Sequence, residues 1–362
     1  MIPVCVLTGF LGSGKTTLLG RLLKSPEFAR TAVIINEFGE IGLDHDLIET
    51  SDESFVTLQT GCLCCTIRGD LVLTLTDILR RRDEGMVTPF DRVVIETSGL
   101  ADPAPILHAV MSDDGLAERL TLAGVVTTVD AVHGAGTLER QPESVKQVAV
   151  ADRLVLTKTD LVAENPDALT DRLAALNPSA PLLTACFGDI DPARLFDARI
   201  WDPSGKLAAL EHDPEKACPG LDPGWIPVFG KRSCSINKIE PHRHHGAHDR
   251  NRHDERIRCF ALIRDRPIPA VALTLFLEVL AEHCGADLLR LKGIVDLAES
   301  PDRPAVIHGV QHVFHPPAFL DRWPSDDRRS RLVFIARDLP REFAQALLDA
   351  IEAEVRETTG SE

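Results

Sequence analysis

The sequence is short of positive charge and has no long apolar run. Its 362 residues include 39 lysines and arginines against 55 aspartates and glutamates, a formal net charge of −16 at pH 7. Nucleic acids and anionic membranes repel an acidic surface, so we expect neither as a partner. No apolar run reaches the roughly 20 residues that a membrane-spanning helix needs. Nucleic-acid binding and membrane insertion are therefore not expected.

A secretory leader is not expected either. A predicted strand begins at Ile2 and leads directly into a glycine-rich motif, so a signal peptide would have to include that motif. Apolar residues make up 44% and charged residues 26% of the chain, as in ordinary globular proteins. The length is sufficient for two domains, each with its own core.

The most informative stretch is residues 9–16, GFLGSGKT, which match G-x-x-x-x-G-K-[ST] at every position. An apolar strand precedes it and leucines at helical spacing follow it. A glycine-rich turn without a ligand is the alternative, but the match lies between a strand and a helix, as phosphate binding requires. We expect Lys15 to reach the β- and γ-phosphates and the Thr16 hydroxyl to bind Mg²⁺. The predicted phosphate-binding residues are Gly9, Gly12, Ser13, Gly14, Lys15, Thr16 and Thr17.

Another apolar strand ends in an acid, Glu96, with Gly99 three residues further on. This arrangement suits an element that places Glu96 near Mg²⁺ or the attacking water and Gly99 near the γ-phosphate. A strand with a chance terminal glutamate would look the same, but its position after a phosphate loop favours the functional interpretation. The predicted catalytic residues are Lys15, Thr16 and Glu96.

The strand at residues 153–157 ends in Thr157-Lys158-Thr159-Asp160, which indicates a guanine site. A carboxylate at Asp160 accepts hydrogen bonds from N1–H and the 2-amino group of guanine, a pair of donors that adenine lacks. The stem of Lys158 would pack on the ring. A site built for two such bonds discriminates strongly against a base without them. Thr157 departs from the asparagine usual at that position, but Lys158 and Asp160 remain, so we expect GTP rather than ATP.

Three of the nine cysteines, Cys62, Cys64 and Cys65, lie within four residues. Three thiolates so close together can bind Zn²⁺ or another thiophilic ion. Cys62 and Cys65 also form a C-x-x-C pair that would suit a redox dithiol, and buried free cysteines can simply fill a core. We expect a large nucleotide-binding protein in the cytoplasm, where thiols stay reduced and bind metal more often than they form disulfides.

Strands alternate with helices over about the first two hundred residues. That order predicts an α/β fold, a P-loop NTPase domain with a mostly parallel sheet and right-handed crossovers. The predicted organisation is a GTPase domain at residues 1–205, a Pro- and His-rich linker at 206–255 and a smaller C-terminal α+β domain at 256–356.

The linker has a cluster of histidines that allows two interpretations. It can hold metal weakly, for loading or buffering, or be a solvated charged segment that happens to be rich in histidine. The five histidines are His242, His244, His245, His248 and His253.

The C-terminal part alternates strands and helices in the order βαβββα, with one predicted strand over residues 305–314. His308 and His312, four residues apart on that strand, would lie on one face. We interpret them as polar-face or interface residues rather than as metal ligands.

Five motifs in one order resemble the CobW-type metallochaperone GTPases, and the resemblance covers essentially the whole chain. They are residues 9–16, Asn36-Glu37-Phe38-Gly39-Glu40, Gly61-Cys62-Leu63-Cys64-Cys65, Glu96-Thr97-Ser98-Gly99 followed by Ala101-Asp102-Pro103, and Thr157-Lys158-Thr159-Asp160. The resemblance implies that the cysteine motif binds metal, commonly Zn²⁺ and in some members Co²⁺ or Fe²⁺. Cys64, Cys65 and Glu37 are then the first expected metal ligands, and Cys62 is the next candidate ligand.

The resemblance also implies Mg²⁺-dependent GTP hydrolysis coupled to metal delivery to a client metalloprotein. GTP and GDP would be the nucleotide partners, and the sequence is compatible with a homo-oligomer without requiring one. Two other functions fit parts of the pattern: metal storage or sensing with a structural nucleotide, and a P-loop small-molecule kinase. The guanine element and the cysteine motif both argue against the kinase.

Overall fold

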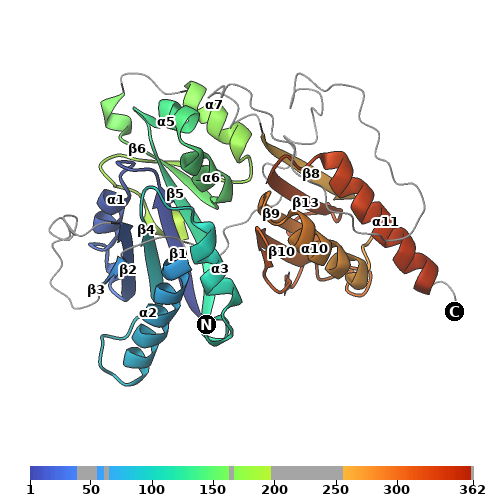
Figure 1. Ribbon diagram of the computed structural model, residues 1–362, viewed down its shortest axis with the longest axis horizontal. Helices are drawn as coiled ribbons and strands as arrows, with labels where there is room; N and C mark the ends of the chain where they lie inside the picture. Colours follow the sequence, from blue (N-terminus) through green and yellow to red (C-terminus); the bar gives the residue numbers. More distant parts are fainter. Residues whose placement is uncertain (39–54, 61–64, 163–166, 197–255, 360–362) are drawn as a thin grey trace.

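The computed structural model describes residues 1–38, 55–60, 65–162, 167–196 and 256–359 (Figure 1). These residues build two sheets, each with its own helices: an N-terminal α/β domain, blue to green in Figure 1, and a C-terminal α+β domain, orange to red. Among the described helices, none is long and apolar enough to cross a membrane.

Within the described residues, the N-terminal sheet has seven strands in the order β3-β2-β4-β1-β5-β6-β7. The pairings between these strands are all parallel, as the sequence predicted. The strands are β1 (Ile2–Gly9), β2 (Thr31–Phe38), β3 (Phe55–Thr60), β4 (Arg92–Thr97), β5 (Leu120–Asp130), β6 (Arg153–Thr157) and β7 (Leu182–Ala185). Parallel strands bring their carboxyl ends to one edge, where ligands bind in such sheets.

Helices cover both faces of this sheet because alternate residues of the strands point to opposite sides. In β1, Val4 and Val6 belong to the core cluster under α2 and α3, whereas Cys5 and Leu7 belong to the cluster under α1. The helices are α1 (Lys15–Leu22), α2 (Cys65–Asp83), α3 (Ala104–Ser112), α4 (Asp114–Ala117), α5 (Gly134–Arg140), α6 (Pro142–Val150), α7 (Asp167–Leu176) and α8 (Pro192–Phe196). Buried on both faces, the strands read as continuous apolar runs.

The C-terminal domain is an antiparallel sheet with helices α10 and α11 packed on one face. Its core includes Phe276 of α10 and Phe334 of β13, which meet edge to face with ring centroids 6.4 Å apart. The elements are β8 (Ile257–Arg264), α10 (Ala270–Cys284), β9 (Leu288–Val295), β10 (Ala305–Val310), β11 (Val313–Phe314), β12 (Ala318–Phe319), β13 (Ser330–Arg337) and α11 (Arg341–Thr359).

The single strand expected over residues 305–314 is wrong. The chain reverses between β10 and β11, which pair antiparallel through Val310 and Val313. Gln311 in the turn has a left-handed φ of 52°, and neither Gln311 nor His312 is a residue that marks such a turn in a sequence. His308 and His312 are therefore not on one face of a strand. His312 instead lies against His108 of α3 in the other domain, with ring centroids 6.5 Å apart.

Candidate functional site

The phosphate loop joins β1 to α1 in the geometry that its glycines predict. Gly9 has φ 141° and Gly14 has φ 88°, both in the region that favours glycine. A Cβ at Gly9 would lie 2.3 Å from Thr128 Oγ1, so no side chain fits there. Lys15 is buried, and its Nζ donates to the carbonyls of Gly9 (3.0 Å) and Phe10 (3.3 Å). The lysine ammonium and the start of α1 thus lie together at the loop.

A hydroxyl and a carboxylate meet beside Lys15. Thr16 Oγ1, in the first turn of α1, donates to Glu96 Oε1 at the end of β4 over 2.8 Å. Glu96 is buried at 5% exposure. Mg²⁺ prefers oxygen ligands and usually keeps several waters, so this pair of oxygens next to a phosphate loop fits a magnesium site. The structure brings together the three predicted catalytic residues.

Gly99, predicted to approach the γ-phosphate, lies against the phosphate loop at Leu11. A Cβ on Gly99 would lie 2.6 Å from Leu11 N and 2.7 Å from Leu11 Cα. Both atoms belong to backbone, so a side chain at this position would push the turn after β4 away from the loop. Only glycine allows the two segments to approach so closely.

Thr157 joins the guanine element to the phosphate loop. Its Oγ1, buried at the end of β6, donates to Ser13 O over 2.7 Å and lies 3.2 Å from Val129 O. A Cβ on Gly14 would be 3.5 Å from the Thr157 side chain, so the loop packs directly on it. The residue that departs from the usual asparagine therefore anchors the loop with its hydroxyl.

Lys158 follows with a left-handed φ of 56°, and its Nζ lies 2.7 Å from Asp130 Oδ2 at the end of β5. Burial alone would raise the pKa of Asp130. The hydrogen bonds from Lys158 and from the backbone N–H groups of Val132 and His133 outweigh it and hold that pKa below its usual range. Asp130 therefore stays ionised and holds the lysine beside the loop.

Asp160, the predicted guanine acceptor, lies in the short 3₁₀ turn Thr159–Leu161 and is exposed. The thiol of Cys186, just after β7, lies 3.7 Å from Asp160 Oδ1. Partial desolvation, followed by the nearby Asp160 carboxylate, raises the pKa of this thiol. Cys186 thus remains a protonated donor to the carboxylate.

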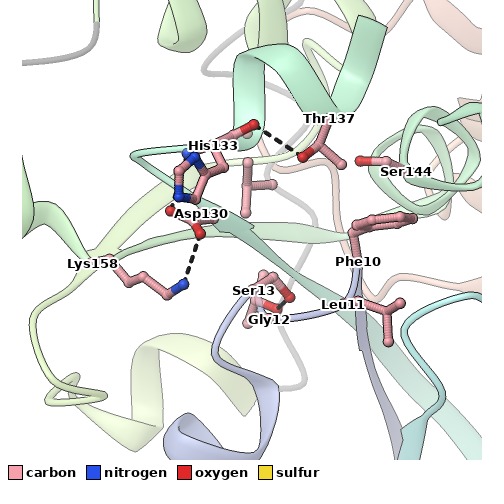
Figure 2. A pocket seen from close by; sticks show the side chains of 12 residues that line it. Phe10, Leu11, Gly12, Ser13, Asp130, His133, Thr137, Ser144 and Lys158 are labelled. Carbon is pink, nitrogen blue, oxygen red and sulfur yellow. Dashed lines mark hydrogen bonds and ion pairs between the residues drawn. The ribbon is translucent and has the colours of Figure 1, made fainter. Parts of the chain in front are cut away.

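A cavity of about 180 Å³ lies between the phosphate loop and the start of α5 (Figure 2). Phe10 to Ser13 form one wall, and Asp130, His133 and Lys158 form the other. Figure 2 shows the Lys158 side chain reaching across toward Asp130 beside Ser13. Asp160 and Thr17 do not line the cavity; Thr17 is exposed on the first turn of α1.

The predicted metal site lies mostly outside the described residues. Cys62 and Cys64 fall there, as do the five histidines of residues 206–255 and that predicted linker itself. The backbone is described at Glu37, next to last in β2, and at Cys65, the first residue of α2. Glu37 pairs with Gln59 of β3, and its neighbour Asn36 pairs with Thr97 of β4. These backbone positions lie at the same sheet edge as Glu96.

A parallel sheet with a phosphate loop after its first strand, and with a hydroxyl–carboxylate pair beside the loop lysine, defines a P-loop nucleotide-binding protein. The chain belongs to the CobW/HypB/UreG family: the model of the CobW/HypB/UreG nucleotide-binding domain matches residues 3–184. The model of the cobalamin synthesis protein cobW C-terminal domain matches residues 257–352. The resemblance seen in the sequence motifs is thereby confirmed.

Curated relatives extend over nearly the whole chain. The zinc chaperone YjiA of Escherichia coli is 34% identical over 95% of this chain and 97% of its own length. The zinc chaperone CobW of Pseudomonas aeruginosa is 32% identical over 93% of this chain and 88% of its own. The crystal structure of Zn(II)-bound YjiA GTPase superposes with a TM-score of 0.65 at 29% identity, covering 97% of this chain and 98% of that one.

Neither the contact of Asp130 with Lys158 nor the anchoring role of Thr157 was predicted from the sequence. A signal for Asp130 was present, because β5 ends in this acid and Glu96 is likewise next to last in β4, and acids at the carboxyl edge of a parallel sheet lie near the ligand. No signal marked the hydroxyl contact of Thr157, since Ser13 is 144 residues away in the sequence.

Proposed function

We propose that the protein is a GTP-hydrolysing zinc chaperone that binds Zn²⁺ at the cysteine motif and delivers it to a client metalloprotein in the cytoplasm. The observation that carries the hydrolytic part is the Thr16–Glu96 contact of 2.8 Å beside Lys15. The similarity to two zinc chaperones over most of the chain supports zinc as the cargo.

In hydrolysis, water attacks the γ-phosphate and charge develops on the phosphoryl oxygens. Lys15 and the amides of the phosphate loop are placed to stabilise that charge. Mg²⁺, held by Thr16 with Glu96 beside it, would supply further positive charge at the phosphates. Buried in the sheet edge, the Glu96 carboxylate is held in place before the reaction begins.

Guanine recognition rests on Asp160 and Lys158. We expect GTP to bind more than tenfold more tightly than ATP, a gap of over ~1.4 kcal/mol. Asp160→Asn should shift the preference toward xanthosine nucleotides, because their 2-oxo group accepts a hydrogen bond from an amide. Equal affinities of the wild type for ATP and GTP, in competition with a fluorescent nucleotide, would contradict this assignment.

Metal binding is coupled to the nucleotide through the shared sheet edge. Glu37 lies near the end of β2, which adjoins the Glu96 strand β4, and Cys65 begins the helix that follows β3, the strand on the other side of β2. Loops ordered by the γ-phosphate are a common GTPase switch, so we expect Zn²⁺ affinity to differ between the GTP and GDP states by about 1–3 kcal/mol.

The deciding experiment measures Zn²⁺ affinity with a GTP analogue, with GDP and without nucleotide, in the wild type and in the Cys64→Ser/Cys65→Ser variant. The double variant should lose tight zinc binding and its effect on GTP affinity, yet still bind GTP without metal. The same zinc affinity in all three nucleotide states would instead favour metal storage or sensing. Deleting residues 242–253 should lower total metal capacity and leave the tightest site in place.

A further inference from the structure

Helix α6 lies between the nucleotide site and the C-terminal domain and contacts both (Figure 1). Gln147, near its middle, is completely buried. Its Nε2 donates to the carbonyls of Gly99 (3.2 Å) and Ala101 (3.0 Å). Both carbonyls belong to the turn after β4 that approaches the phosphate loop at Leu11. One side chain therefore holds that turn at two points.

The two N–H donors of one amide nitrogen make this pair of contacts. Two carbonyl acceptors fix the amide orientation, with its NH₂ group toward the turn. Its Oε1 is also buried and accepts no hydrogen bond from the described residues. Lys146, the preceding residue, adds an ion pair of 2.9 Å to Asp102 in the same segment. Two successive residues of α6 thus bind the segment of residues 99–102, one by hydrogen bonds and one by an ion pair.

The helix itself is firmly fixed. Thr127 Oγ1 of β5 donates to Gln147 O over 2.8 Å. At the other end, Asn177 Nδ2, completely buried, donates to the carbonyls of Val148, Ala149 and Ala151. These bonds satisfy acceptors that a helix C-terminus otherwise leaves open. The nine residues of α6 therefore form a rigid piece.

The C-terminal end of α6 contacts the C-terminal domain. Asp152, two residues after α6, accepts from Arg290 (2.6 Å) and lies 2.5 Å from the Lys292 ammonium, both on β9. Ala149 of α6 packs with Leu289 and Ile335 in a buried cluster shared by the two domains. A shift of the C-terminal domain relative to the N-terminal domain would have to break these contacts or move α6.

We propose that Gln147 is a positioning residue for GTP hydrolysis. Through α6, the hydrogen bonds of Gln147 to the Gly99 turn depend on the contact of the C-terminal domain with Asp152. The proposal rests on the GTP hydrolysis of the proposed function but not on zinc delivery. A partner that pulls on the C-terminal domain would thereby alter turnover at a site it does not touch, which is the requirement for coupling between two sites.

The first test replaces Gln147 with leucine, which has a similar volume and no donors. Gln147→Leu should lower kcat by about tenfold, equivalent to ~1.4 kcal/mol in the barrier, with KM for GTP changed by less than about threefold. Val148→Ala is the matched control, because it removes buried apolar volume from the same helix and leaves the turn contacts intact. That control should lower the melting temperature and keep kcat. A wild-type kcat in Gln147→Leu, or equal losses of kcat in both variants, would overturn the positioning role.

The second test works from the other domain. Asp152→Asn should lower kcat by about threefold, and little more should be lost when it is combined with Gln147→Leu, since neighbours in one network are not additive. If Asp152→Asn does not fold, Ile335→Ala tests the apolar part of the same interface. Wild-type kcat in the folded interface variants, or full additivity with Gln147→Leu, would overturn the dependence on the C-terminal domain. A wild type without GTP turnover would overturn the proposed function itself.

Discussion

Two lysine–aspartate contacts occupy different environments and have different partners. At the nucleotide edge, Lys158 meets Asp130 at 2.7 Å with the lysine side chain 35% exposed. At the domain interface, Lys292 meets Asp152 at 2.5 Å with its side chain only 2% exposed. Asp152 also pairs with Arg290, so these three side chains together carry one positive charge in excess. Asp130 holds a functional residue in place, whereas Asp152 holds two domains together around an unbalanced charge.

The largest effect in this comparison is expected from removing the shared acid. Asp152→Asn should reduce the free energy of unfolding at pH 7 by about 3–5 kcal/mol, because it leaves two buried cations without their carboxylate. Urea unfolding followed by circular dichroism measures the change. Asp91→Asn is the control, since Asp91 pairs with Arg30 on the surface and should change stability by only about 0–1 kcal/mol.

The same variant has a signature in its pH dependence. Burial alone would raise the pKa of Asp152, but Arg290 and Lys292 outweigh it and hold that pKa well below its usual range. A carboxyl with a lowered folded pKa stabilises the protein above its unfolded pKa of about 3.9 and loses this contribution as the pH falls below it. The wild type should therefore lose its advantage over Asp152→Asn under acid conditions. A constant difference between pH 7 and pH 3 would contradict the ionised pair.

At the nucleotide edge, Lys15→Ala should lower GTP turnover by about 10²–10³-fold, because it removes a cation placed for the charge of the transition state. Phosphate release under single-turnover conditions measures the loss. Lys24→Ala removes an exposed lysine just beyond the same helix and should leave turnover unchanged. Retained turnover in Lys15→Ala would mean that the loop binds nucleotide without supporting its hydrolysis.

The two regions also differ in how far the sequence reveals them. The phosphate loop, Glu96, Gly99 and Lys158 could be predicted because each lies in a short motif at the end of an apolar strand. Asp152 and Arg290 are 138 residues apart, and neither has a local pattern that marks it as a partner. The hairpin at Gln311 was missed for a related reason, since tertiary pairing imposes a left-handed backbone on a residue that does not usually adopt it.

A smaller effect is expected from the hydroxyl that anchors the phosphate loop. Thr157→Val keeps the shape of the side chain but leaves Ser13 O without its buried donor, which costs about 1–2 kcal/mol. GTP and GDP affinities should fall by roughly tenfold, whereas Thr157→Ser should retain most of them. Thr184→Val, on the adjacent strand β7 and exposed, controls for the loss of a threonine hydroxyl. Wild-type affinity in Thr157→Val, measured by nucleotide titration, would show that the loop needs no such anchor.

The smallest effect should come from Lys292, the most deeply buried lysine of the described residues. Burial, reinforced by the charge of Arg290, lowers the pKa of Lys292 despite the opposing attraction of Asp152. The folded environment therefore makes Lys292 easier to deprotonate than a lysine in water. Lys292→Met leaves Asp152 paired with Arg290 and with the N–H of Val125. The Asp152 carboxylate therefore keeps a cation and a hydrogen-bond donor.

Replacing buried charges by apolar side chains of similar volume is often neutral or stabilising where no remaining charge is left without a partner. We expect Lys292→Met to change the free energy of unfolding by less than about 1 kcal/mol, with any change toward greater stability. Lys158→Met should be the more harmful of the two, because among the described residues Lys158 is the one cation paired with Asp130. Greater destabilisation by Lys292→Met in parallel urea titrations would mean that Asp152 needs both cations, and that the positive excess at the interface contributes to stability.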